Sequence, residues 1–164
     1  MKNESIRPLR TIRSFVIREG RFTDAQKNAV AKLWPNLGIE IESAYPLNLN
    51  DYFLTLQPLV FDIGFGNGES LISIAQQRSD LNFVGIEVYR PGIGMVLRKI
   101  EELDLNNIRI INADVMNVLS KINDDSLLGV LIWFPDPWPK KRHQKRRLIQ
   151  KEFLLEIIRV LQSR

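Results

Sequence analysis

The sequence predicts a doubly wound, mostly parallel α/β sheet of the Rossmann-like class, with about four strands and an N-terminal extension. From residue 58 onward, short apolar segments alternate regularly with amphipathic ones. A glycine-rich turn, Gly64 to Gly68, joins the first apolar segment to the helical segment that follows it. Regular alternation of strand and helix patterns, opened by such a turn, is typical of parallel βαβ units.

Residues 1–57 are expected to form a basic, partly helical extension, because they lack strong strand patterns. Thr23 is a suitable N-cap for a helix over about residues 24–32. That helix is expected to end before Trp34 and Pro35, because the residue before a proline disfavours helical backbone. The remaining residues, 58–164, are expected to form the sheet domain.

Within that domain the elements follow one another in order. Strands are predicted at residues 59–63, 82–88, 108–111 and 127–134, each an apolar run of strand length. Helices are predicted from the glycine turn to about residue 77, at 91–103, at 115–121, and from about 145 to the end. Pro91 is placed where a proline is tolerated, at the start of a helix.

Composition limits the class of protein. Hydrophobic residues make up 45% of the chain, which excludes a disordered protein, and there is no cysteine to build a disulfide framework. The N-terminus is polar and charged, and the longest apolar run, residues 127–134, is far too short to span a membrane. These features predict a cytoplasmic protein without a membrane partner.

The basic residues are concentrated in two blocks. Six Lys or Arg lie in residues 1–21 and six more in residues 140–147, whereas residues 22–139 carry more acidic than basic side chains. Two basic surface segments beside an acidic body are expected when a protein grips a polyanion. A solvated helix face and a flexible tail would give the same pattern.

Three acidic residues come near the carboxyl ends of predicted strands: Asp62 in the first, Glu87 in the second and Asp114 after the third. Such strand ends line one crevice in this class of sheet, where ligands bind. There Glu87 can accept hydrogen bonds from both hydroxyls of a ribose, and Asp114 can accept one from an adenine amino group. Taken singly, each acid is as easily a helix N-cap or a solvated side chain.

The glycines Gly64, Gly66 and Gly68 let the backbone turn tightly and approach a ligand. An ordinary strand-to-helix turn can use glycines too. The three carboxylates favour S-adenosyl-L-methionine over NAD as the cofactor, because a cationic ligand gains from an acidic pocket and a pyrophosphate is repelled by it.

The fourth predicted strand ends in a proline-braced carboxylate, Asp136, between Pro135 and Pro137. The prolines restrict the backbone, which holds the carboxylate in place to accept hydrogen bonds from a guanine. Trp138 can stack on a base; alternatively, the segment is a rigid loop with a packed indole. The single histidine, His143, offers no metal cluster in a chain without cysteine.

The segment FPDPWPKKRH, residues 134–143, with Arg146, Arg147 and Leu148 after it, resembles the signature of the bacterial tRNA (guanine-N7-)-methyltransferases. Further matches lie at residues 13–15, 20–23, 62–66 and 85–87. The resemblance implies a class I S-adenosylmethionine-dependent fold, with cofactor contacts at Asp62, Glu87 and Asp114. It also implies catalysis at Asp136, substrate contact by Lys140, and methylation of a guanine in the variable loop of tRNA, at tRNA position 46.

Guanine N7 has an in-plane lone pair, so no proton must be removed before methylation. We therefore expect Asp136 to orient the base and stabilise its developing positive charge. The basic run beside it, including Arg142, Arg146 and Arg147, is expected to pair with tRNA phosphates. Arg10, Arg13, Arg18 and Arg21 would form a second clamp.

Members of that family continue with further strands and a Thr-Asp-Trp segment, so the resemblance implies a chain truncated at its C-terminus. The last predicted strand would then present an open apolar edge, which predicts poor activity and self-association. Two other functions stay open: methylation of an exocyclic amino nitrogen in nucleic acid, and an RNA-binding fragment with impaired catalysis. An NAD oxidoreductase is disfavoured by the glycine spacing.

Overall fold

The computed structural model describes residues 20–41 and 46–163. Within them a five-stranded sheet has the order β1-β4-β3-β2-β5, and every neighbouring pair is parallel. The strands are β1 (Gly38–Ile39), β2 (Leu59–Ile63), β3 (Asn82–Ile86), β4 (Ile108–Ile111) and β5 (Gly129–Ile132). The predicted fold class is confirmed, with the two-residue β1 as an additional strand.

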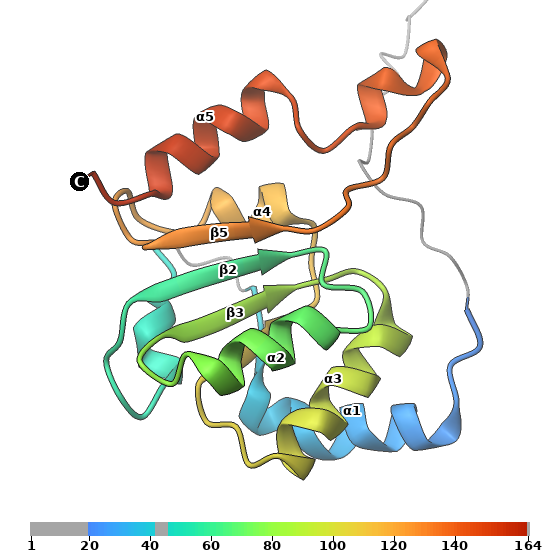
Figure 1. The fold of residues 1–164 in the computed structure, drawn as a ribbon, viewed down its shortest axis with the longest axis vertical. Helices are drawn as coiled ribbons and strands as arrows, with labels where there is room; N and C mark the ends of the chain where they lie inside the picture. The colour runs from blue at the N-terminus through green and yellow to red at the C-terminus, as the bar shows by residue number, and fades with distance from the viewer. Residues whose placement is uncertain (1–19, 42–45, 164) are drawn as a thin grey trace, which may run out of the picture.

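Helices cover both faces of the sheet (Figure 1). On one face, α1 (Asp24–Leu37), α2 (Glu69–Gln77) and α3 (Arg90–Glu102) pack in one apolar cluster with Val60, Phe83 and Ile110 from the strands. On the other face, α4 (Val115–Leu119) and α5 (Lys151–Val160) pack with Phe61 and Ile86. Strands β2 and β3 are buried along their whole length, because helices cover both of their sides.

Helix α1 continues past the predicted stop at Trp34 and includes Pro35. The turn after the proline is closed by the Gly38 N–H, which donates to the Trp34 carbonyl. Packing of the buried Ala29 and Leu33 against the cluster around α3 holds this helix in place. Since β1 directly follows α1 and pairs with β4, part of the extension joins the sheet. The division of the chain at residue 57 stays a prediction.

The C-terminal helix also differs from the prediction. Residues Lys141–Arg146 form a separate 3₁₀ helix, η2, and α5 begins only at Lys151. Between them the Gln150 side chain donates to the Lys145 and Arg147 carbonyls at 2.8 and 2.9 Å, so backbone acceptors that a continuous helix would use are bonded to a side chain. Another 3₁₀ helix, η1, covers Leu49–Tyr52. No described helix is long and apolar enough to cross a membrane.

Candidate active site

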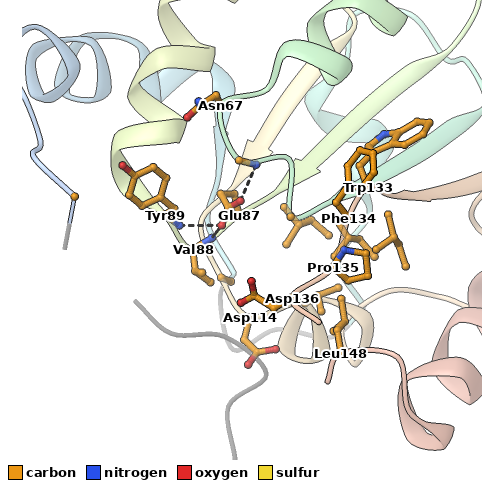
Figure 2. Close-up of a pocket in the computed structure, with 18 residues that line it drawn as sticks. Asn67, Glu87, Val88, Tyr89, Asp114, Trp133, Phe134, Pro135, Asp136 and Leu148 are labelled. Carbon is orange, nitrogen blue, oxygen red and sulfur yellow. Dashed lines mark hydrogen bonds between the residues drawn. The ribbon is translucent and has the colours of Figure 1, made fainter. Parts of the chain in front are cut away.

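A cavity of about 600 Å³ lies where the chain order of the strands reverses, at the carboxyl ends of β2, β3, β4 and β5 (Figure 2). Ile63, Ile86 and Ile132, the last residues of β2, β3 and β5, all line it. Ligands of open parallel sheets bind at this switch point, because the loops there diverge to opposite faces. The other lining residues are Gly20, Gly64, Gly66, Asn67, Glu87, Val88, Tyr89, Ala113, Asp114, Val115, Trp133, Phe134, Pro135, Asp136 and Leu148.

Glu87 is held rigidly at the centre of this site. Its Oε2 accepts a hydrogen bond from the Gly66 N–H at 2.8 Å. Its Oε1 accepts from the N–H groups of Val88 at 2.7 Å and Tyr89 at 3.0 Å. A carboxylate offers roughly four acceptor positions. Three are used by the backbone, so Glu87 keeps one for a ligand and also ties the glycine loop to the end of β3.

Asp114 combines two roles that the sequence left as alternatives. It is the N-cap of α4, where one carboxylate oxygen accepts the Met116 N–H at 3.0 Å. It also lines the cavity, on the side formed by the segment after β4. The capping bond therefore fixes the position of a carboxylate whose other oxygen has no hydrogen-bond partner among the described residues.

The three glycines of the turn have different surroundings. All have positive φ, +72° at Gly64, +59° at Gly66 and +76° at Gly68, a conformation that glycine adopts without steric cost. A Cβ at Gly64 or Gly66 would meet no atom within 4 Å, whereas one at Gly68 would lie 2.0 Å from the Val96 side chain. Gly64 and Gly66 therefore leave space for a ligand, and Gly68 allows α3 to pack closely.

Asp62 is placed differently from the other two acids. Its side chain is fully buried, it does not line the cavity, and neither oxygen has a hydrogen-bond partner among the described residues. Burial, together with the nearby charge of Glu87, raises the pKa of Asp62 to about 7. In a strand, successive side chains point to opposite faces. Its neighbours Phe61 and Ile63 pack in the cluster on the α4 and α5 side, so Asp62 points to the face covered by α1, α2 and α3.

Asp136 lines the cavity from the segment after β5, with Trp133, Phe134 and Pro135 before it. Figure 2 shows Trp133, Phe134 and Pro135 along one side of the site and Glu87 and Tyr89 along the other. Asp136 itself is exposed. A carboxylate at the rim can contact a substrate that enters from solvent.

Trp138 lies outside the cavity, packed within the basic segment formed by residues 140–147. The Arg146 guanidinium lies over the indole at 5.2 Å from its centroid, and the His143 ring meets it edge-on at 5.5 Å. Arg147 donates to the carbonyls of Pro137 at 3.1 Å and Trp138 at 3.3 Å. These contacts attach the basic segment to the backbone and indole of the Pro137–Trp138 loop.

The predicted site residues thus divide into two groups. The structure brings Gly64, Gly66, Glu87, Asp114 and Asp136 together around one cavity. The predicted residues that do not line it are Asp62, Gly68, Trp138, Lys140, Arg142, Arg146 and Arg147. Of the predicted N-terminal clamp, Arg10, Arg13 and Arg18 lie outside the described residues.

Several residues that line the cavity were not among the predicted site residues, including Asn67, Tyr89, Phe134 and Leu148. The first three lie within two residues of a predicted site residue. Their nearness to a strand end could therefore have been used to predict that they line the cavity. Leu148 follows the basic run, and only the tertiary structure brings it to the cavity.

The charge around the cavity has one sign. Glu87, Asp114 and Asp136 line it, and no Lys or Arg does so among the described residues. Such a lining favours a cationic ligand. The part of the chain that the structure describes contains no group of three or more His, Cys, Asp or Glu placed to hold a metal ion.

Comparison with known sequences gives consistent matches. A family model described as "Putative methyltransferase" matches residues 56–164. The chain is 51% identical over 154 residues to the tRNA (guanine-N(7)-)-methyltransferase of Nitrosococcus oceani, covering 93% of this chain and 64% of that protein. It is 48% identical over 158 residues to the protein of the same name from Shewanella oneidensis, covering 96% of this chain and 66% of the relative. The chain therefore spans less than two thirds of the length of these relatives.

Solved structures share the fold at lower identity. A structure from Methanococcus maripaludis, titled a putative S-adenosyl-L-methionine-dependent methyltransferase, superposes with a TM-score of 0.50 at 22% identity, covering 91% of this chain and 64% of that one. An antibiotic-related methyltransferase superposes with a TM-score of 0.53 at 16% identity, covering 74% and 62%. These similarities show a common fold.

Proposed function

Because this chain belongs to the methyltransferase family whose model matches residues 56–164, we propose that it transfers a methyl group from S-adenosyl-L-methionine to N7 of a guanine in tRNA. The observation that carries the proposal is the separation of negative charge in the cavity from positive charge on the neighbouring basic segment. Three carboxylates and no described Lys or Arg line the cavity, while the basic segment begins four residues after Asp136. An acidic pocket beside a basic surface suits a cationic methyl donor and a polyanionic substrate.

The residues of the cavity fit the proposed cofactor. A Cβ at Gly64 or Gly66 would point into open space, so a ligand can approach the backbone of the turn there. Glu87 has one acceptor position left for a ribose hydroxyl, and Asp114 is held at the far side by its capping bond. When bound, S-adenosyl-L-methionine supplies an electrophilic methyl group on a sulfonium ion.

The side chains act by placing the reactants and by stabilising positive charge. Glu87, Asp114 and Asp136 lower the potential in the cavity, which favours a sulfonium before transfer and a methylated guanine after it. Asp136 accepts hydrogen bonds from the guanine and so orients N7. No proton has to be removed from N7, so Asp136 is not required as a base. Good alignment of reactants alone can lower a barrier by roughly 7–11 kcal/mol.

The basic segment provides the affinity for tRNA. Lys140, Lys141, Arg142, Lys145 and Arg146 are all exposed. They can pair with phosphates without reading sequence. The tRNA variable loop is the proposed target, on the strength of the resemblance of residues 134–148 to the relatives' signature. A tRNA substrate also implies a cytoplasmic location for the protein.

The experiment is incubation of the chain with labelled S-adenosyl-L-methionine and unmodified tRNA, followed by chemical cleavage at N7-methylguanine. We expect label in tRNA and cleavage at one guanine. Asp136→Asn should lower turnover at saturating tRNA by at least about tenfold, a loss of roughly 1.4 kcal/mol in transition-state stabilisation. Asp104→Asn is the matched control, since Asp104 is exposed and its φ of +50° suits asparagine.

Other outcomes identify the other functions. Labelled tRNA that resists N7 cleavage indicates methylation of an amino nitrogen. Binding of tRNA without measurable binding of S-adenosyl-L-methionine, by titration calorimetry, indicates an RNA-binding fragment without catalysis. Full turnover of Asp136→Asn contradicts the proposed role of Asp136.

A further inference from the structure

We propose that Phe134 is the aromatic side chain that stacks on the target guanine at the mouth of the cavity, and that Trp138 instead packs the basic segment. The inference rests on the proposed function and names a substrate-positioning residue for it. It comes from the different surroundings of two aromatic residues only four positions apart.

The indole of Trp138 is already in contact with other side chains of the protein. Arg146 covers the indole at 5.2 Å, and the His143 ring meets it edge-on at 5.5 Å. The indole Nε1 is buried without a hydrogen-bond partner among the described residues. A base could stack on the face that Arg146 covers only after that contact was broken, and Trp138 does not line the cavity.

Phe134 has the opposite surroundings. It lines the cavity and its side chain is 96% exposed, although it belongs to a large apolar residue type that normally gains from burial. Its φ is +47°, a left-handed conformation that is unfavourable for a bulky residue. Strained backbone persists at functional sites, but Trp138 also has a positive φ, +38°, so the exposure of the Phe134 ring and its place in the cavity lining are what distinguish the two residues.

The position of Phe134 suits stacking before methyl transfer. Asp136, two residues later, lines the same cavity, and Pro135 between them restricts the backbone. Stacking contacts the face of a purine, so N7 at its edge remains open toward the cavity. A ring that binds the face and a carboxylate that binds the edge would together orient the base.

The first experiment compares Phe134→Leu and Phe134→Tyr with the unaltered chain. Stacking of one base contributes enough affinity that its loss should lower kcat/KM for tRNA by about 5- to 150-fold. We expect this loss in Phe134→Leu and recovery to within about threefold in Phe134→Tyr, because tyrosine keeps the aromatic face. Affinity for S-adenosyl-L-methionine, measured by calorimetry, should stay within about twofold of the unaltered chain in both variants.

A second experiment does not depend on turnover. A tRNA containing 6-thioguanosine is bound to the chain and irradiated, and the crosslinked residue is identified by tandem mass spectrometry. We expect the crosslink at Phe134. A crosslink at Trp138, or unchanged kcat/KM in Phe134→Leu alongside a loss in Trp138→Leu, overturns the inference.

The two experiments separate this inference from the proposed function. If the unaltered chain places no methyl group on N7, the proposed function fails, and the crosslink still shows which aromatic residue meets a guanine. If the unaltered chain methylates N7 and Phe134→Leu does so equally well, only the role of Phe134 is wrong.

Discussion

At the scale of single residues, Asp62 is the clearest case of a carboxyl group whose environment disfavours its charged form. Both oxygens are buried without a partner among the described residues, and burial with the charge of Glu87 raises its pKa to about 7. An unfolded chain has an aspartate pKa of 3.8. Between these values the folded chain keeps a proton that the unfolded chain has lost. Stability therefore falls as pH rises from about 4 to about 7, and levels off above that.

Asp62→Asn should remove this dependence. The amide keeps the shape of the side chain without a charge, so we expect the variant to melt at a higher temperature than the unaltered chain at pH 8. At pH 5, where Asp62 is protonated, the two should melt within a few degrees of each other. Calorimetric melting at both pH values checks this, and an equal difference at both contradicts it.

The glycine turn permits a matched pair of substitutions. Gly68→Ala puts a Cβ 2.0 Å from a methyl group of Val96 at a φ of +76°, so either the Val96 side chain or α3 must shift and the melting temperature should fall strongly. Gly64→Ala meets no atom within 4 Å and should cost only the left-handed backbone, roughly 1–2 kcal/mol.

The order of the two alanine variants should be reversed for ligand binding, with the larger loss of affinity in Gly64→Ala. The new methyl group of Gly64→Ala occupies space that the cofactor is proposed to fill, so we expect weaker S-adenosyl-L-methionine binding from a chain that remains folded. Calorimetric binding and thermal melting of both variants decide this. Normal cofactor affinity in Gly64→Ala would place the ligand elsewhere.

How far these residues could be predicted depends on their environment. Glu87, Asp114 and Gly64 were predictable, because parallel strand ends must meet at one edge. Asp62 was predicted to line the same crevice but does not. Because β2 is buried on both faces, its residues do not alternate between apolar and polar. The sequence therefore does not indicate toward which face of the sheet a given side chain points.

At the scale of elements, β5 and α5 carry an apolar surface that the rest of the described chain leaves uncovered. β5 is an edge strand, and Leu154, Leu155 and Ile158 on α5 are 46%, 55% and 68% exposed. Next to the strand, Leu128 is 48% exposed. An uncharged edge beside an apolar helix face is a template for association.

Self-association at this surface is therefore predicted. We expect sedimentation velocity to detect species larger than the monomer at concentrations of tens of micromolar. Ile158→Lys should shift the distribution toward monomer, while Met95→Lys, on the opposite layer of helices and 39% exposed, should not. A monomer at every concentration contradicts the prediction.

Element boundaries were predictable where periodicity is long and failed where tertiary contacts decide. β1 has only two residues, too few for any pattern, and exists because it pairs with β4. α1 extends beyond Pro35 because the Gly38 N–H closes its last turn. The separation of η2 from α5 is an exception with a local cause that apolar periodicity does not reveal, because the Gln150 side chain donates to the Lys145 and Arg147 carbonyls at 2.8 and 2.9 Å.

At the scale of the whole molecule, the distribution of charge sets the salt dependence expected of the proposed binding to tRNA. Binding of tRNA by the basic segment should weaken steeply with salt, because each phosphate contact releases a counterion. A Lys140→Gln, Lys141→Gln double variant should reduce the slope of log affinity against log salt by about 1–2.

The control variant also loses two lysine charges, but on α1 and away from the basic segment. Lys27 and Lys32 lie on α1 and pair with Asp24 at 3.1 Å and Glu101 at 2.7 Å. Replacing both with glutamine should leave the slope within about half a unit of the original. Filter binding over a salt series measures all three proteins. Equal slopes would show that the basic segment does not contact phosphate.

The strand order also has a consequence for synthesis on the ribosome. β2, β3 and β4 leave the ribosome in the sequence in which they pair, so that half of the sheet can assemble early. The other side of β2 pairs only with β5, whose residues follow those of β2 by more than sixty positions. A nascent chain that ends before Gly129 therefore has β2 as an edge strand with one side unpaired, and emergence of Gly129–Ile132 pairs that side.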